Sequence, residues 1–317
     1  MERTLAKTDS RGLALQGRVN EYIAESVADN TKRAYASDWR QFAAWCESNG
    51  FGSLPANPAT VAAYFAHLAD SGKKASTIDR ARAAIHMAHT SAAVTDPTAA
   101  ESVKKTLQGI RRSVGTAKTK KAPVLSVDVE AMVNALPDTT LGVRDRAIIL
   151  VGFAGAFRRS EIAGIAIEHI EHTAEGVKIL LPKSKTDQDA AGRVVGIKRG
   201  RKPHTCPVRA LEAWIAAAGI TSGPVFRHID RHSRILEGIT PQAVALVVKR
   251  AATAAGLDPA KYSGHSLRAG CVTQGAINGA SVTNIMRQTG HKSSDTVQGY
   301  IRIANVFKHN VSGMLGL

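Results

Sequence analysis

The chain has 317 residues, of which 44% are hydrophobic and 21% charged, and its 42 lysines and arginines exceed its 26 aspartates and glutamates to give a net charge of +16. This length suffices for two domains with a substantial core, and the positive excess favours a polyanionic partner, most simply nucleic acid. No run of about 18 apolar residues is present, which excludes a membrane-spanning helix, and the N-terminus, MERTLAKTDSRG, lacks the apolar core of a signal peptide.

Residues 14–113 show apolar residues at helical spacing, interrupted by repeated start and stop signals. We expect five helices here, at about 14–28, 31–50, 58–72, 73–90 and 98–115. Asn30 is the expected N-cap of the second, and Gly50 its stop. The first part of the chain is therefore predicted to be an all-helical domain.

Basic residues cluster along these predicted helices. The clusters are Lys32 and Arg33; Lys73, Lys74, Arg80 and Arg82; and Lys104 and Lys105, followed by Arg111 and Arg112. Each could be a solvated helix face or a surface that contacts nucleic acid. Phosphate contacts and base contacts use the same side chains, so the sequence does not separate them.

The segment GTAKTKKAP, residues 115–123, is polar, basic and closed by a proline, which indicates an exposed linker. We therefore predict a first domain over residues 1–114 and a second over 124–317. Residues 1–113 carry 15 basic and 11 acidic residues, a net +4, and residues 114–317 carry 27 and 15, a net +12. The stronger positive field is expected from the second domain.

The second domain opens with SVDVEAMVNALP, where Ser126 is the expected helix cap, and continues with the apolar TTLGVRDRAIILVGFAGAF. That run leads directly into Arg158 and Arg159. An arginine at the end of so apolar a helix needs an anionic partner, because a buried unpaired charge is costly. Glu161 could be that partner, or a ligand phosphate could be held beside the pair.

Three segments then alternate or cluster β-branched residues between turn signals: IAIEHIEHT, GVKILLPKSK and GRVVGIKRG. They predict a small three-stranded antiparallel sheet. Lys185 lies in the hairpin between the last two strands, where a lysine is ordinarily solvent-exposed. Helices are expected to begin at Pro207 and Pro241.

Residues 262–302 contain SGHSLRAG and TGHKSSDTVQGYIR. A helix that opens at Gly264 places His265 and Arg268 one turn apart on one face, where both can address one anion. A short second helix ends at a glycine stop, the next turn carries His291, and Tyr300 lies on a final helix beside its apolar stripe. Singly, such residues are often capping pairs or core tyrosines; together they supply an anion-directed nucleophilic site.

The SGHSLRAG, RRSEI and GYIR segments resemble the HxxR box, the first arginine box and the tyrosine box of the tyrosine recombinases, or phage integrases. In the arginine box, Arg is followed by any two residues, then by Glu, and then by an aliphatic residue. This register selects Arg158 as the box arginine and leaves Arg159 as an exposed neighbour. SKT resembles the pattern around that family's catalytic lysine, which favours Lys185, with Lys183 as the competitor. The resemblance spans nearly the whole chain and fills six catalytic positions: Arg158, Lys185, His265, Arg268, His291 and Tyr300, with Glu161 in support.

The resemblance implies a mainly α protein with a small antiparallel sheet, made of an N-terminal helical-bundle DNA-binding domain and an α+β catalytic domain. It implies site-specific recombination of double-stranded DNA through a 3'-phosphotyrosyl intermediate and a Holliday junction. It also implies inverted-repeat sites, a tetramer on paired sites, and docking of the tail NVFKHNVSGMLGL on a neighbouring protomer.

We expect no metal and no cofactor. Cys46, Cys206 and Cys271 lie far apart without zinc-type spacing, which also fits a reducing cytoplasm. We expect the bacterial cytoplasm or nucleoid, with a gene that a bacterium, a phage or another mobile element could carry. Two other classes use similar features. A type IB topoisomerase or telomere resolvase shares the residues but usually carries extra domains, and a DNA-binding protein without catalysis would not need the tyrosine with both arginines.

Overall fold

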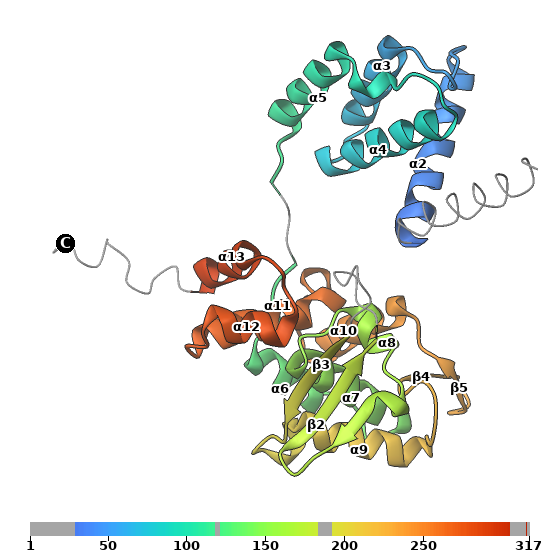
Figure 1. Ribbon diagram of the computed structural model, residues 1–317. Coiled ribbons are helices and arrows are strands. Elements are labelled where there is room, and N and C mark those ends of the chain that lie inside the picture. The colour runs from blue at the N-terminus through green and yellow to red at the C-terminus, as the bar shows by residue number, and fades with distance from the viewer. Residues whose placement is uncertain (1–28, 118–120, 183–191, 305–314, 316–317) are drawn as a thin grey trace, which may run out of the picture. The chain divides into compact units, whose positions relative to one another are not determined.

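The computed structural model describes residues 29–117, 121–182, 192–304 and 315. The chain divides into two compact units, residues 1–119 and residues 120–317 (Figure 1). The helix predicted for 14–28, both hairpin lysines Lys183 and Lys185, and most of the tail lie outside the described residues.

The first unit is a bundle of four described helices, α2 (Asp29–Ser48), α3 (Pro58–Asp70), α4 (Ala75–Ser91) and α5 (Glu101–Val114), with a 3-10 turn at Pro97–Ala99. Their apolar faces meet in a core that contains Phe42, Phe65 and Ile85. Asn30, expected as a cap, instead lies inside α2, where its side-chain oxygen accepts a hydrogen bond from Arg33.

The second unit is also mainly helical and contains two small antiparallel sheets, so the predicted fold class is confirmed. Its helices are α6 (Ser126–Asn134), α7 (Thr140–Ala154), α8 (Arg159–Ala163), α9 (Pro207–Ala218), α10 (Pro241–Ala254), α11 (Gly264–Ile277), α12 (Val282–Thr289) and α13 (Ser294–Ala304). Its strands are β1 (Ile170–His172), β2 (Gly176–Leu181), β3 (Arg193–Lys198), β4 (Arg227–Ile229) and β5 (Ile235–Gly238). The helices expected at Pro207 and Pro241 begin there.

The predicted three-stranded sheet is confirmed, with the order β1-β2-β3 and antiparallel pairing throughout. Ile179 pairs with Val195 and Val177 with Ile197, and these four side chains are buried on the inner face. Figure 1 shows this sheet alongside α7 and α9. The β4-β5 pair was not predicted, because its strands are only three and four residues long and β4 consists of Arg, His and Ile.

Helix α7 runs through the main core with buried residues on every side, as its apolar sequence predicts. Thr139 caps its start by accepting a hydrogen bond from the backbone N–H of Gly142. Its C-terminal end leads into Arg158, so a rigid buried helix fixes the position of that arginine.

The expectation that Ser126 caps α6 is wrong. Ser126 is the first residue of the helix, and Asp128 reaches back to accept a hydrogen bond from the N–H of Leu125. The Ser126 hydroxyl donates instead to the side-chain oxygen of Gln274, on α11. A tertiary partner thus replaces the local capping contact.

Helices α11, α12 and α13 share a small apolar core of Val272, Ala276, Ile285 and Val297, which is separate from the main core of the unit. These three helices lie together in Figure 1. Among the described residues, no helix is long and apolar enough to cross a bilayer.

Candidate active site

Arg158 occupies the turn between α7 and α8, immediately before the first residue of α8. Two residues earlier, Ala156 is fully buried and has a positive φ of 51°, a conformation that costs an L-residue about 1 kcal/mol or more. The turn is thus held by its surroundings, and it aims the Arg158 side chain, 17% exposed, into the protein. Its neighbour Arg159 is exposed.

Glu161 anchors Arg158 at two points. Its Oε1 lies 2.5 Å from Arg158 Nη1, and its Oε2 accepts the backbone N–H of Arg158 at 2.8 Å. The glutamate side chain is only 3% exposed. Charge-assisted bonds of this kind fix both the backbone and the guanidinium of Arg158.

Helix α11 presents His265 and Arg268 from consecutive turns. Ser263 accepts the N–H of His265, so the helix begins as its sequence predicts. Arg268 is 2% exposed and donates from Nη1 to the carbonyl of Ala156 at 2.7 Å. Burial, and next the charge of Arg158, lowers the pKa of Arg268 to about 10.

His291 follows Gly290, which ends α12 in the left-handed conformation at φ 68°. Its Nε2 lies 3.2 Å from Arg268 Nη2, and its Nδ1 lies 2.7 Å from the hydroxyl of Thr289. Arginine can only donate, so Nε2 is the acceptor and the imidazole hydrogen belongs on Nδ1. The Thr289 hydroxyl accepts from Nδ1 and donates to the carbonyl of Ile285 at 2.8 Å.

Tyr300, on α13, lies opposite His265, with 3.2 Å between the phenol oxygen and His265 Nε2. Burial raises the pKa of Tyr300, and Arg268 partly counters that effect. Burial also lowers the pKa of His265, with Arg268 and Arg158 adding to the effect. These directions keep the proton on the tyrosine and leave His265 neutral, able to accept it.

One partly buried arginine of this cluster, Arg193, was not predicted from the sequence. It begins β3, its side chain is 16% exposed, and its Nη2 lies 3.4 Å from Glu161 Oε2. Burial lowers the pKa of Arg193. Its partners are 32 and 95 residues away in sequence, so no local signal could identify it.

The described cluster therefore holds three guanidinium groups, on Arg158, Arg193 and Arg268, and one carboxylate, on Glu161. The imidazole of His291 adds no charge at neutral pH, because burial and the nearby arginines lower its pKa to about 4. A mostly buried site with this excess of positive charge is suited to an anion of about two negative charges.

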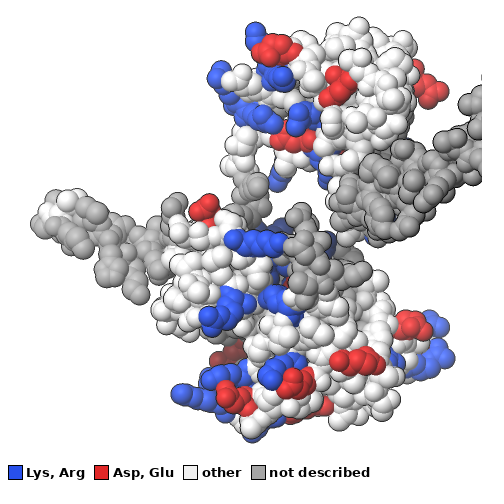
Figure 2. Space-filling model, in the orientation of Figure 1, with Lys and Arg blue, Asp and Glu red and all other residues white. Residues whose placement is uncertain are grey.

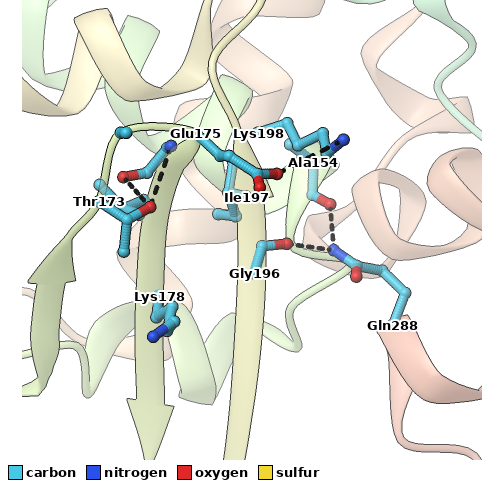
Figure 3. A pocket seen from close by; sticks show the side chains of 11 residues that line it. Ala154, Thr173, Glu175, Lys178, Gly196, Ile197, Lys198 and Gln288 are labelled. Carbon is cyan, nitrogen blue, oxygen red and sulfur yellow. Dashed lines mark hydrogen bonds and ion pairs between the residues drawn. The ribbon is translucent and has the colours of Figure 1, made fainter.

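A cavity of about 880 Å³ lies beside this cluster and holds none of the predicted catalytic residues. It is bordered by β2, β3 and Gln288, whose side-chain amide donates to the carbonyls of Ala154 and Gly196 at 2.9 and 3.2 Å (Figure 3). Its wall includes Lys178 and Lys198, each close to a glutamate. The candidate anion site is thus formed by converging side chains and not by this cavity.

The basic residues predicted to bind DNA in the first unit are exposed: Lys32, Arg33, Lys73, Lys74, Arg80, Arg82, Lys104 and Lys105. Figure 2 shows basic side chains gathered over α5, with acidic ones among them. Arg80 differs from the others, because it forms two hydrogen bonds, of 2.6 and 3.0 Å, with the buried carboxylate of Asp38.

Within the described residues, no group of three or more His, Cys, Asp or Glu side chains is placed to hold a metal ion. All three cysteines are free thiols.

Comparison with known proteins gives consistent matches. Residues 124–305 match the family described as "Phage integrase family", and residues 20–93 match "Phage integrase, N-terminal SAM-like domain". The chain is 39% identical over 293 residues to an "Integrase/recombinase xerD homolog" of Selenomonas ruminantium, covering 91% of this chain and 86% of the relative. It is 24% identical over 299 residues to "Recombinase cre" of Escherichia phage P1, covering 88% and 85%.

Among solved structures, a lambda integrase dimer bound to a COC' core site, residues 75–356, superposes with a TM-score of 0.61 at 15% identity. The match covers 91% of this chain and 94% of that one, and it shows a shared fold.

Proposed function

The chain belongs to the phage integrase family and is a site-specific DNA recombinase of the tyrosine type, and from this premise we propose that Tyr300 is its nucleophile. Arg158, Arg268, His265 and His291 would form the pocket for the scissile phosphate, with Glu161 holding Arg158. The observation that carries the proposal is the buried positive excess beside a tyrosine whose hydroxyl lies 3.2 Å from a neutral histidine.

In the proposed cleavage step, the Tyr300 oxygen bonds to the phosphorus of a DNA phosphodiester, and the bond from phosphorus to the 5' oxygen breaks. The phenolic proton passes to His265 Nε2, since a phenol with a pKa near 10 is a poor nucleophile until it loses that proton. The forked guanidinium groups of Arg158 and Arg268 stabilise the charge on the non-bridging oxygens. The products are a 3'-phosphotyrosyl ester and a 5' hydroxyl.

The departing 5' oxygen needs a proton, and we propose Lys185 as its donor. Lys185 lies outside the described residues, so this assignment rests on the resemblance of SKT to the family pattern. Lys183 is the alternative donor.

The ester on Tyr300 conserves the energy of the broken bond, so a second DNA end can reverse the step without ATP or metal. We propose that this end comes from a partner duplex, which gives strand exchange through a Holliday junction. The DNA would carry inverted-repeat sites, and four protomers would assemble on paired sites. The domain over 1–114 would contact one face of the duplex, and the linker 115–123 would join it to the domain over 124–317.

Covalent trapping tests the nucleophile. The DNA site is first located by mapping the protected sequence in DNA from the source organism, and a nicked duplex carrying that site is then offered to the protein. Wild type should accumulate an adduct whose phosphate maps to Tyr300. Tyr300→Phe should bind the site with unchanged affinity and form no adduct, because only the hydroxyl is lost.

Tyr262→Phe is the matched control, because Tyr262 is buried in the main core outside the pocket, and its adduct should form at the wild-type rate. An adduct that still forms with Tyr300→Phe would show that another residue is the nucleophile. Binding without any adduct in wild type would instead favour a DNA-binding protein without catalysis.

A further inference from the structure

Arg193 contacts both halves of the candidate phosphate pocket with one guanidinium group. Its Nη1 donates to the main-chain carbonyl of Gln288 at 2.7 Å, and its Nη2 lies 3.4 Å from Glu161 Oε2. Gln288 belongs to α12, three residues before His291, and Glu161 is the residue that anchors Arg158. The side chain therefore spans from the base of one proposed phosphate ligand to the base of another.

The packing around Arg193 allows little adjustment. Gly290 lies against the guanidinium, since a Cβ added there would come within 2.9 Å of the Arg193 Cδ and Nε. Arg193 Nε is buried and has no hydrogen-bond partner among the described residues. A buried donor left unsatisfied costs on the order of 1–3 kcal/mol. The chain tolerates this cost while the other two nitrogens of the group keep their partners.

The C-terminal helices depend on such contacts for their placement. Helices α12 and α13 share their apolar core with α11 and not with the main core that contains α7 and the sheet. The last turn of α12 is fixed to the sheet by Arg193 and by the Gln288 amide, which donates to Gly196 on β3 and to Ala154 at the end of α7 (Figure 3). His291 follows directly after this fixed turn.

We propose that Arg193 is a positioning residue that sets the spacing between the Arg158–Glu161 pair and the Arg268–His291 pair. This inference rests on the proposed function of those four residues. The guanidinium does not itself need to reach DNA, because its hydrogen bonds within the described residues go to groups that hold the phosphate ligands. Misplacement of a reacting group by about 1 Å can cost a rate on the order of 100-fold.

The experiment compares full-length Arg193→Ala and Arg193→Lys with wild type on the same nicked duplex, and measures DNA affinity and cleavage rate separately. We expect affinity within twofold of wild type and cleavage roughly 10- to 100-fold slower. Arg193→Lys keeps the charge but cannot bond to Gln288 and Glu161 in one plane, so its cleavage rate should also be lower than that of wild type. This variant serves as the test if the alanine variant fails to fold. Lys198→Ala, an exposed residue at the other end of β3, is the control.

A double-mutant comparison distinguishes positioning from a loss of stability. If Arg193 acts partly through His291, Arg193→Ala should slow a His291→Ala protein several-fold less than it slows wild type. An equal slowing in both backgrounds, wild-type cleavage by both Arg193 variants, or a loss of DNA affinity in step with cleavage would each overturn the inference. These outcomes leave the assignment of Tyr300 intact, since wild type still forms its adduct, whereas a wild type without adduct would refute the proposed function itself.

Discussion

In the free protein His291 Nε2 is a hydrogen-bond acceptor, whereas the proposed contact with a phosphate needs it to be a donor. In the free protein Nε2 accepts from Arg268, and the hydrogen on Nδ1 is directed to Thr289. To donate to a phosphate oxygen from Nε2, the imidazole must gain a proton or move its hydrogen between the two nitrogens. A bound phosphate would favour the protonated form, because a nearby anion raises the pKa of a histidine.

We predict that the stabilisation supplied by neutral His291 depends on pH. Burial and the charges of Arg268, Arg158 and Arg193 lower its folded pKa to about 4, against about 6.5 when unfolded. Its contribution is therefore fully present above about pH 6.5 and is lost as pH falls toward 4. Thermal unfolding without DNA should show the gap in melting temperature between wild type and His291→Gln narrowing over this window, by a few degrees. A gap that stays constant between pH 7 and pH 4.5 would contradict the lowered pKa of His291.

Prediction at the scale of single residues succeeds where the partners are close in sequence. Arg158 and Glu161 are three residues apart, and their spacing alone suggested a pair. Arg193 and Arg80 could not be assigned in this way, because their acidic partners, Glu161 and Asp38, lie 32 and 42 residues away in the sequence. A basic residue at the start of a strand has no distinguishing pattern, so tertiary structure is needed to identify its role.

At the scale of elements, the segment before α6 is bound to the start of α11, the helix that carries His265 and Arg268, and to the 3-10 turn before it. The N–H of Ala122 donates to the carbonyl of Lys261 at 2.9 Å, and that of Val124 to the carbonyl of Ser266 at 3.0 Å. The close approach depends on Gly270, where an added Cβ would lie 1.8 Å from the carbonyl oxygen of Val124. The end of the predicted linker is thus attached to the 3-10 turn before α11, and the residue that follows the linker is attached to the first turn of α11.

We predict that Gly270→Ala destabilises the second unit by about 1–3 kcal/mol, because backbone atoms of a buried segment must move. Cleavage should fall as well, since α11 would shift with the segment. Gly109→Ala is the matched control: Gly109 is helical, and a Cβ there meets nothing within 4 Å. That control should stabilise by about 0.5–1 kcal/mol. Denaturant unfolding of both variants measures the difference, and equal effects would show that the contact at Val124 is easily relieved.

The elements predicted well from sequence are those that carry their own start and stop signals. Helix α11 begins at Gly264 after the Ser263 cap, and α12 ends before Gly290 in the left-handed conformation. The β4-β5 pair was not predicted although Asp230 in its turn accepts the N–H groups of His232 and Arg234, because its strands have only three and four residues. Alternation over three or four residues is too short to separate a strand from a loop.

At the scale of the whole molecule, the +16 charge is unevenly divided between the two halves, and many basic side chains have acidic partners. In the first unit Arg80 is bonded to Asp38 and Arg111 to Asp79. Lys104 and Lys105 are exposed on α5, a helix whose opposite face packs into the core. Only cations that neutralise phosphates release counterions. The salt dependence of DNA binding therefore depends on which basic residues already have acidic partners as much as on the net charge.

We predict that replacing Lys104 and Lys105 together with alanine makes DNA binding less sensitive to salt. Each lysine that contacts a phosphate contributes roughly 0.9 to the slope of log affinity against log salt, so the double variant should lose about 1 to 2 from that slope.

Arg80→Ala is the contrasting variant. It should change the slope less, because the guanidinium already serves Asp38, and it should lower the stability of the helical unit by about 1–2 kcal/mol, because the buried carboxylate loses both hydrogen bonds. Binding titrations at several salt concentrations, with thermal unfolding of each variant, separate the two effects. An unchanged slope in the lysine variant would mean that this face of α5 is only solvated, and a larger loss for Arg80→Ala would place the DNA contact on α4 instead.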